Sequence, residues 1–263
     1  MKEFKNKTVI ITGGSSGIGR ATAELFAEEG ANICIASRND INGIELEKKL
    51  SKKGCNIKFI KTDVAKVKDL EIMVREAIKF FKSIDILFNS AGFEGRIKEI
   101  KDTTVEEWDE IMDLHLKGCF VASKLVIPYM IKQKNGVIIN VGSEIGSSFR
   151  FAPNYVPYGT SKAAVMAFTK ALAIELAPYK IRVNCVSPGA IKTPMLEREI
   201  GKWLERGLYK TREDALESIY NSYPIGFIGE PIDIAHAVIY LASEKSHFTT
   251  GTVLSIDGGG GII

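Results

Sequence analysis

The sequence predicts an α/β protein built on one doubly wound parallel sheet of about seven strands, with helices on both faces. Short β-branched apolar runs alternate with longer amphipathic stretches along the whole chain. That pattern is typical of strands buried on both faces and joined by crossover helices. A glycine-rich loop at residues 12–19 joins the first strand to the first helix. This is the turn at which parallel α/β sheets commonly bind phosphate groups.

The elements follow one another in a regular order. Strands are predicted at residues 8–11, 32–36, 57–60, 84–88, 137–141, 181–186 and 252–256. Helices are predicted at about 18–29, 41–53, 68–81, 104–132, 161–176 and 232–243. The helix at 104–132 should bend or end near Pro128, because proline lacks the amide donor of a helical residue. No linker divides the chain, so residues 1–263 are expected to form a single dinucleotide-binding and catalytic domain.

Composition excludes several classes of function. The net charge of +3 is spread along the chain, without a basic run that would indicate binding to nucleic acid or to a membrane. The N-terminus lacks the apolar core of a signal peptide, and no apolar run approaches the roughly 18 residues of a membrane span. The four cysteines are far apart and form no Cys-x-x-Cys pair, so neither a disulfide framework nor a metal site is expected. We therefore expect a cytoplasmic protein.

The glycine loop has the spacing Gly-x-x-x-Gly-x-Gly, not the commoner Gly-x-Gly-x-x-Gly. Glycines allow a sharp turn and a close approach of backbone to a pyrophosphate at the helix N-terminus, as in Rossmann-type folds. The loop residues expected to contact a dinucleotide are Gly13, Ser15, Ser16, Gly17, Ile18 and Gly19. The alternative is a tight strand–helix turn that binds no ligand.

The residues after the second and third strands indicate which dinucleotide binds. Enzymes of this fold that prefer NAD often carry a carboxylate after the second strand, which would repel a 2′-phosphate. Here the chain reads Ser37-Arg38, a neutral residue followed by a planar cation suited to phosphate. The sequence therefore predicts NADP rather than NAD. Asp63 and Val64 are expected beside the adenine, although Asp63 is equally suited to be a helix N-cap.

Tyr158 and Lys162 are four residues apart, so they share one face of a helix. A lysine cation close to a phenol is expected to lower the phenol's pKa from its usual value of about 10. Alone, this pair is a weak pattern. It is strengthened by polar or glycine-rich loops after the fourth, fifth and sixth strands, at residues 89–92, at Ser143 and at 187–189. The carboxyl ends of parallel strands border the ligand crevice.

Taken together, these motifs resemble the short-chain dehydrogenase/reductase family, over residues 7 to about 260. The matching elements are residues 12–19, Asn89 to Gly92, Ser143, Tyr158 with Lys162, Pro188-Gly189 with Thr193, and Asp257 to Gly259. The resemblance implies that Tyr158 exchanges a proton with the substrate oxygen, that Ser143 hydrogen-bonds this oxygen, and that Lys162 holds the nicotinamide ribose. It also implies cofactor contacts by Asn89, Ala91, Gly92, Pro188, Gly189, Ile191 and Thr193.

The chain departs from the family pattern in three places. His115 stands where the family has a catalytic asparagine, and we interpret it as a possible member of the proton relay or as a histidine satisfied by local backbone. The gap between Ser143 and Tyr158 is slightly long, and its aromatic residues Phe149, Phe151 and Tyr155 are candidates for a pocket wall. Residues 194–224 are expected to form a substrate lid or a fixed helical hairpin. The apolar side of this segment would consist of Met195, Leu196, Trp203, Leu208 and Tyr209.

These observations predict an oxidoreductase that transfers hydride between NADP(H) and a small carbonyl or alcohol. A 3-oxoacyl-carrier-protein reductase and a sugar or polyol dehydrogenase are both alternatives, and a non-catalytic dinucleotide sensor is a third. Candidate basic residues for a carrier-protein partner are Arg96, Lys98, Arg150 and Arg198. The resemblance also implies a homo-oligomer, either a dimer or a homotetramer.

Overall fold

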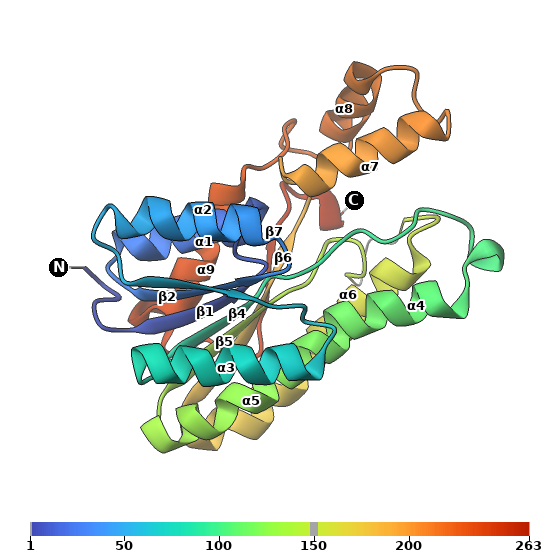
Figure 1. The fold of residues 1–263 in the computed structure, drawn as a ribbon. Coiled ribbons are helices and arrows are strands. Elements are labelled where there is room, and N and C mark those ends of the chain that lie inside the picture. Colours follow the sequence, from blue (N-terminus) through green and yellow to red (C-terminus); the bar gives the residue numbers. More distant parts are fainter. Residues whose placement is uncertain (1, 148–151, 263) are drawn as a thin grey trace.

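The protein is built around a seven-stranded sheet, described here from a computed structural model that covers residues 2–147 and 152–262 (Figure 1). All strand pairings are parallel, and the strand order is β3-β2-β1-β4-β5-β6-β7. The strands are β1 (Thr8–Thr12), β2 (Asn32–Ser37), β3 (Ile57–Lys61), β4 (Ile86–Asn89), β5 (Gly136–Val141), β6 (Ile181–Pro188) and β7 (Val253–Ile256). The predicted fold class is confirmed. The order reverses between β1 and β4, which opens a crevice beyond the carboxyl ends of these two strands.

Helices cover both faces of the sheet (Figure 1). One face is covered by α1 (Gly17–Glu28), α2 (Asp40–Ser51) and α9 (Pro231–Ala242), and the other by α3 (Val67–Phe81), α5 (Gly118–Gln133) and α6 (Val156–Leu176). Each layer shares an apolar core with the strand residues that face it, which explains why the strands are apolar throughout. Short 3₁₀ turns lie at Ile100–Asp102, Ala177–Tyr179, Glu244–Ser246 and Gly260–Ile262.

The predicted helix at 104–132 was expected to bend or end near Pro128, but its irregular turn lies earlier in the chain. It consists of α4 (Val105–Met112), a π-helical turn (Asp113–Lys117) and α5. The helix does not end at Pro128, because α5 continues to Gln133. Val126 and Met130, on either side of the proline, are fully buried. Their packing offsets the amide hydrogen bond that Pro128 cannot make.

The sequence-based expectation that no apolar run approaches a membrane span is corrected by Val105–Gln133, which is long and apolar enough to cross a membrane by length and composition, with a mean hydropathy of 1.3. Half of its most apolar stretch is buried within the protein. The run packs against α3, β4 and β5. Its apolar character therefore has an explanation in the core of the domain.

A helical pair projects beyond the carboxyl edge of the sheet (Figure 1). It consists of α7 (Pro194–Glu205) and α8 (Arg212–Asn221), both within residues 194–224, for which a lid or a helical hairpin was predicted. The pair has a small apolar core of its own, formed by Leu196, Ile200, Ala215, Ile219, Tyr223 and Ile228. This core is separate from the two cores of the sheet, and polar contacts join α7 to the loop after β4.

Candidate active site

The glycine loop packs tightly against the loop that follows β4. Gly13 has a φ of +69°, and a Cβ atom at this position would lie 2.9 Å from the Cα of Ala91. The Thr12 hydroxyl accepts hydrogen bonds from the backbone amides of Ser90 (3.1 Å) and Ala91 (3.2 Å). A Cβ at Gly19 would lie 2.4 Å from the carbonyl oxygen of Gly13. The glycines are therefore required by the close approach of these backbones.

The N-terminus of α1 is suited to an anion. Ser16 is its N-cap in an extended conformation, and its side chain makes no capping hydrogen bond. The first turn of α1 contains no acidic residue. The amides of this turn and the positive end of the helix dipole face the crevice, which fits the pyrophosphate of a dinucleotide.

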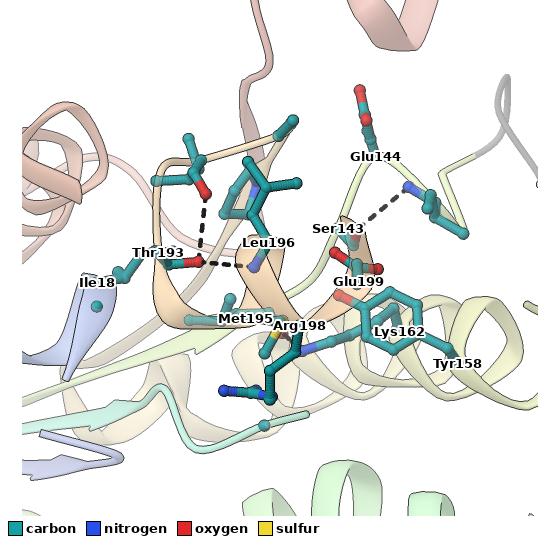
Figure 2. A pocket seen from close by; sticks show the side chains of 18 of the residues that line it. Ile18, Ser143, Glu144, Tyr158, Lys162, Thr193, Met195, Leu196, Arg198 and Glu199 are labelled. Atoms are coloured by element: carbon teal, nitrogen blue, oxygen red, sulfur yellow. Dashed lines mark hydrogen bonds between the residues drawn. The ribbon is translucent and has the colours of Figure 1, made fainter. Parts of the chain in front are cut away.

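A cavity of about 350 Å³ extends from this helix terminus to the Tyr158 side chain (Figure 2). The predicted site residues that line it are Gly13, Ser16, Gly17, Ile18, Gly19, Gly92, Ser143, Tyr158, Lys162, Pro188, Gly189, Ile191 and Thr193. They come from five separate segments of the chain. The structure thus brings the loop residues and the predicted chemical residues to one place.

Other predicted residues lie outside this cavity: Ser15, Ser37, Arg38, Asp63, Val64, Asn89, Ala91 and His115. Arg38 is exposed just after β2, farther along the carboxyl edge of the sheet. Asn89 is buried, and its Nδ2 donates to Asn140 Oδ1 at 2.9 Å, so its amide links β4 to β5. Asp63 is not the N-cap of α3, because that position is Lys66.

Tyr158 and Lys162 lie in the first two turns of α6, and Ser143 follows β5. The buried Lys162 Nζ donates to the Val141 carbonyl at 2.9 Å and lies 5.7 Å from the centre of the Tyr158 ring. Burial lowers the pKa of Lys162. Ser143 is buried beside the Tyr158 hydroxyl and hydrogen-bonds to it.

In the protein alone, effects other than the expected influence of Lys162 dominate the pKa of Tyr158. Burial of the phenol raises its pKa well above the usual value, and the negative charge of Glu199 raises it further. The hydrogen bond with Ser143 acts in the opposite direction but is outweighed. The Tyr158 hydroxyl is therefore protonated at neutral pH in this environment.

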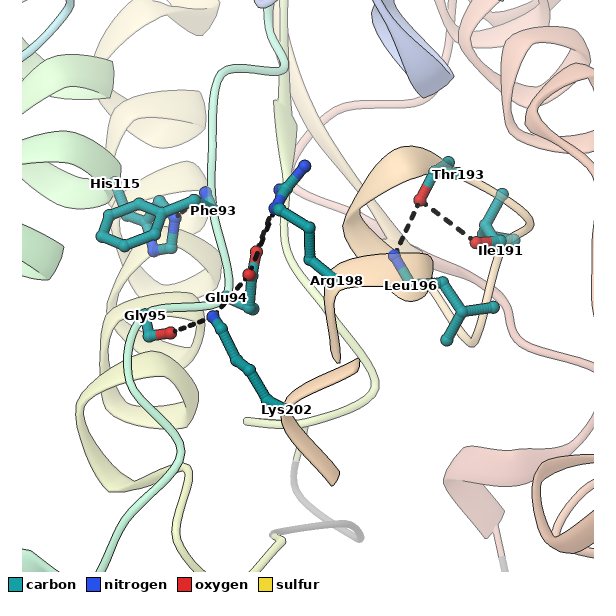
Figure 3. Close-up of polar contacts among 9 residues, drawn as sticks. All are labelled: Phe93, Glu94, Gly95, His115, Ile191, Thr193, Leu196, Arg198 and Lys202. Carbon is teal, nitrogen blue, oxygen red and sulfur yellow. Dashed lines mark hydrogen bonds and ion pairs between the residues drawn. The ribbon is translucent and has the colours of Figure 1, made fainter. Parts of the chain in front are cut away.

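His115 is fully enclosed, in the π-helical turn that precedes α5. Its Nε2 accepts the backbone amide of Phe93 at 3.3 Å (Figure 3), so Nδ1 carries the proton and donates to Ser161 Oγ at 2.8 Å. Ser161 Oγ in turn donates to the Tyr158 carbonyl at 2.7 Å. Burial lowers the pKa of His115 well below 6.5, and the Lys162 cation lowers it further. Both imidazole nitrogens are thus bonded to protein groups.

Helix α7 is attached across the crevice by a buried carboxylate that the sequence did not single out (Figure 3). Glu94, in the loop after β4, accepts from Arg198 at 3.0 and 3.3 Å and from Lys202 at 2.6 Å. Lys202 also donates to the carbonyl of Gly95 at 2.8 Å. Burial by itself raises the pKa of Glu94, but the two cations outweigh it and hold the pKa below its usual value.

Two further carboxyl groups line the cavity and were also missed by sequence reasoning. Glu144 accepts a hydrogen bond from the hydroxyl of Tyr223. Glu199, on α7, hydrogen-bonds to the hydroxyl of Tyr155, which accepts from Trp203 Nε1 at 3.1 Å. Acidic residues on an amphipathic helix usually face solvent, so no sequence signal distinguishes Glu199 from its exposed neighbours.

The expected pocket walls are present in part. Tyr155, Met195, Leu196 and Trp203 line the cavity, as predicted, whereas Leu208 is half exposed on the outside of the pair. Tyr209 packs against Trp203 with ring centres 5.9 Å apart. Phe149, Arg150 and Phe151 lie outside the described residues.

Of the basic residues considered for a carrier-protein partner, the three that the structure describes are engaged in ion pairs. Arg96 and Lys98 both contact Glu107, at 3.0 and 2.6 Å. Arg198 is bound to Glu94, as described above. A partner with acidic groups would have to compete with these carboxylates.

Comparisons with known proteins extend over almost the whole chain. The family model described as "Enoyl-(Acyl carrier protein) reductase" matches residues 13–260. An uncharacterized oxidoreductase of Thermotoga maritima is 37% identical over 97% of this chain and 96% of its own length. The 3-oxoacyl-[acyl-carrier-protein] reductase FabG of the same organism is 36% identical, covering 97% of this chain and 98% of its own. The solved structure of NAD⁺-bound xylitol dehydrogenase superposes with a TM-score of 0.92 at 31% identity, covering 98% of this chain and all of its own.

Proposed function

The chain belongs to the short-chain dehydrogenase/reductase family, whose members are nicotinamide-dependent oxidoreductases acting on CH–OH groups. We propose that it interconverts a small carbonyl compound and the corresponding alcohol, with NADP(H) as cofactor and Tyr158 as the acid–base residue. One observation carries the proposal. Ser143, Tyr158 and Lys162 meet at one end of a cavity whose other end is the uncapped N-terminus of α1. A dinucleotide along this cavity would have its phosphates at the helix and its reactive end beside Tyr158.

Tyr158 is suited to donate a proton to a carbonyl oxygen, because burial keeps its hydroxyl protonated at neutral pH. Ser143, which hydrogen-bonds to Tyr158, would hold the same oxygen while negative charge develops on it. Lys162, with its cation anchored on the Val141 carbonyl, would stabilise the phenolate that remains. A bound nicotinamide supplies or accepts the hydride, and Pro188, Gly189, Ile191 and Thr193 would hold it on the opposite wall.

The direct test is Tyr158→Phe, followed by NADPH consumption at 340 nm and by NADPH binding through its fluorescence. We expect turnover to fall by at least about 1,000-fold while the Kd for NADPH changes less than about 2-fold. Tyr179→Phe is a matched control, because it removes the hydroxyl of an exposed tyrosine that lies outside the cavity. Normal turnover by Tyr158→Phe would remove Tyr158 from the mechanism. A wild-type chain that binds NADPH but reduces no carbonyl would instead favour the dinucleotide sensor.

NADP is the proposed cofactor because of the residues around the end of β2. Arg38 is exposed there and forms no ion pair with a described residue. The nearest acid in sequence, Asp40, is paired with Lys61 at 3.0 Å. An unpaired guanidinium at this edge is available for a 2′-phosphate. Arg38→Ala should raise the KM for NADPH about 10-fold and leave that for NADH unchanged. Wild-type preference for NADH would refute the assignment.

We also propose that residues 194–224 act as the substrate lid. Helix α7 forms one wall of the cavity, and it is attached to the domain chiefly by the Glu94 ion pairs and by the contact between Trp203 and Tyr155. Such partly exposed polar contacts can break and re-form during turnover. Hydrogen exchange should be faster in α7 than in α6, and slower in α7 once NADPH and substrate are bound.

A second candidate function is 3-oxoacyl-carrier-protein reduction, because several relatives bear that name. The ion-paired state of Arg96, Lys98 and Arg198 and the helical cover of the cavity favour a small free substrate instead. The name of the xylitol dehydrogenase relative supports a sugar or polyol. Comparing kcat/KM for acetoacetyl-carrier protein and for small hydroxy ketones would decide between these substrate classes. A kcat/KM at least 100-fold higher for the carrier-bound substrate would favour the reductase.

We propose a positioning role for His115 instead of a place in the proton relay. Its two nitrogens link the Phe93 amide to Ser161, and through Ser161 to the backbone of Tyr158. Its ring also packs edge-on against the Tyr158 ring, with centres 5.5 Å apart. His115→Asn is expected to lower kcat without a change in the shape of its pH profile between pH 5.5 and 7.5. A new inflection in that range would indicate a relay role.

The assembly is proposed to be a homo-oligomer, a dimer or homotetramer, located in the cytoplasm. Phe120 of α5 and Ile174 of α6 are 48% and 79% exposed, which is unusual for large apolar side chains on adjoining helices. Light scattering after size exclusion should give two or four times the chain mass. Ile174→Asp should reduce that mass, whereas a monomeric wild type would refute the proposal.

A further inference from the structure

Glu199 is a carboxyl group of the cavity that the proposed reaction does not use. Glu199 projects from α7 into the cavity, and Figure 2 shows its carboxyl group next to the Tyr158 hydroxyl and Ser143. The proximity has an electrostatic consequence, because the charge of Glu199 is, after burial, the largest cause of the raised pKa of Tyr158. A carboxylate in this position opposes formation of the Tyr158 phenolate. The presence of Glu199 is therefore not explained by proton transfer at Tyr158.

Glu199 has no ion-pair partner among the described residues, even though two cations are close to it on the same helix. Arg198 and Lys202 are both turned to Glu94, with contacts of 3.0 and 2.6 Å. The hydrogen-bond partner of Glu199 is the hydroxyl of Tyr155. A carboxyl group has several lone pairs, so one tyrosine leaves acceptor capacity toward the cavity.

The Tyr155 hydroxyl orients this carboxyl group. Trp203 Nε1 donates to the Tyr155 oxygen at 3.1 Å, so the tyrosine proton is directed to Glu199. The rings of Tyr155 and Tyr158 also pack edge-on, with centres 6.3 Å apart. The Trp203–Tyr155–Glu199 chain thus holds an acceptor at a defined place beside the acid–base residue.

We propose that Glu199 is a specificity-determining residue that hydrogen-bonds to a hydroxyl group on the carbon next to the reacting carbonyl, so that the preferred substrates are α-hydroxy ketones and the corresponding vicinal diols. This inference rests on the proposed function, because it takes Tyr158 and Ser143 as the groups that bind the reacting oxygen. A hydroxyl on the adjacent carbon would then point to the carboxyl group beside them. Substrates without this hydroxyl would leave a partly buried acceptor without its partner.

The protonation behaviour of Glu199 favours a hydroxyl over a cationic group in the substrate. Burial raises the pKa of Glu199 to about 7, and the charge of Glu94 contributes, while Tyr155 and the two cations of α7 act against the rise. Near neutral pH the group is therefore an acid and a carboxylate in comparable amounts. A hydroxyl, which both donates and accepts, can bond to either form, whereas an ammonium group needs the carboxylate.

The experiment compares ketones that differ by one hydroxyl: 3-hydroxybutan-2-one with butan-2-one, and 2-hydroxycyclohexanone with cyclohexanone. We expect wild-type kcat/KM to be about 10- to 100-fold higher for the hydroxylated member of each pair. Glu199→Leu, which removes both donor and acceptor, should reduce this ratio at least 5-fold, mainly through KM of the hydroxylated ketone, and should leave butan-2-one unchanged or faster. Glu205→Leu is the matched control, because Glu205 is exposed at the end of the same helix.

The outcomes separate the two proposals. Equal kcat/KM for the two ketones of each pair, in wild type and in Glu199→Leu, would overturn the inference while leaving the proposed reductase activity intact. If replacing Glu199 lowers kcat/KM more for the cationic ketone quinuclidin-3-one than for the hydroxy ketones, the inference would also be overturned, in favour of a cation-binding role. No NADPH-dependent reduction of any ketone would instead refute the proposed function itself.

Discussion

The buried histidine beside Tyr158 makes the stability of this protein depend on pH in a predictable way. His115 is 1% exposed, and both of its ring nitrogens are bonded to protein groups in the neutral state. Its pKa in the folded chain is therefore well below 6.5, the value expected in the unfolded chain. Below pH 6.5 the unfolded chain binds a proton that the folded chain does not. Stability is thus fully present above pH 6.5 and is lost as the pH falls.

The size of this effect follows from linkage. With an unfolded pKa of 6.5 and a folded pKa below the range tested, lowering the pH from 7.5 to 5.5 costs about 1.4 kcal/mol through this one residue. Other groups titrate over the same range, so wild type must be compared with variants that lack only this imidazole. Urea unfolding of wild type, His115→Asn and His115→Gln at both pH values, at one protein concentration, measures the difference.

Between pH 7.5 and pH 5.5, the free energy of unfolding of both variants is expected to fall by about 1.4 kcal/mol less than that of wild type, whatever their stability at pH 7.5. Asparagine and glutamine differ in size, so agreement between them separates titration from packing. If the free energy of unfolding had the same pH dependence in all three proteins, the reasoning would be wrong, because His115 would then gain its proton equally in the folded and unfolded chains.

Three further perturbations test other parts of the site. Gly19→Ala should weaken NADPH binding at least about 10-fold by fluorescence titration, because its Cβ would lie 2.4 Å from the carbonyl of Gly13; unchanged affinity would contradict the close approach. Glu94→Gln removes the counterion of the half-exposed Arg198 and of a second α7 cation. A screened loss of about 1 kcal/mol should raise the substrate KM about 5-fold and speed tryptic cleavage in residues 194–224; cleavage at the wild-type rate would count against the lid. Ser143→Ala should lower kcat about 100-fold with the NADPH Kd unchanged, and a parallel loss of cofactor affinity would indicate a structural role.

Patterns along the chain were sufficient to predict the sheet and most of the cavity. Strands buried on both faces are apolar throughout, and parallel strands end at the same edge, so the residues after β1, β4, β5 and β6 had to meet there. The spacing of Tyr158 and Lys162 placed both on one face of α6. Such predictions need only local periodicity and the topology of the sheet.

Other features depend on contacts between distant segments. The irregular turn of the long helix was expected at Pro128 but lies at Asp113–Lys117, because packing of α5 tolerates the proline. His115 was recognised from its position in the sequence, yet its state depends on Ser161, which is 46 residues away. The depression of its pKa comes from enclosure by several elements, and no local pattern reports that.

The sequence by itself determined the fold class, the edge of the sheet that binds ligands and the residues that resemble a catalytic set, because each follows from periodicity or from short motifs at strand ends. Only the tertiary structure decided the acidic side of the cavity. Glu197 and Glu199 are two positions apart on α7, but one is exposed and paired with Arg212 at 2.7 Å, while the other lies against Tyr158. Their difference arises from how α7 docks across the crevice, which sets desolvation and long-range pairing that an amphipathic pattern does not encode.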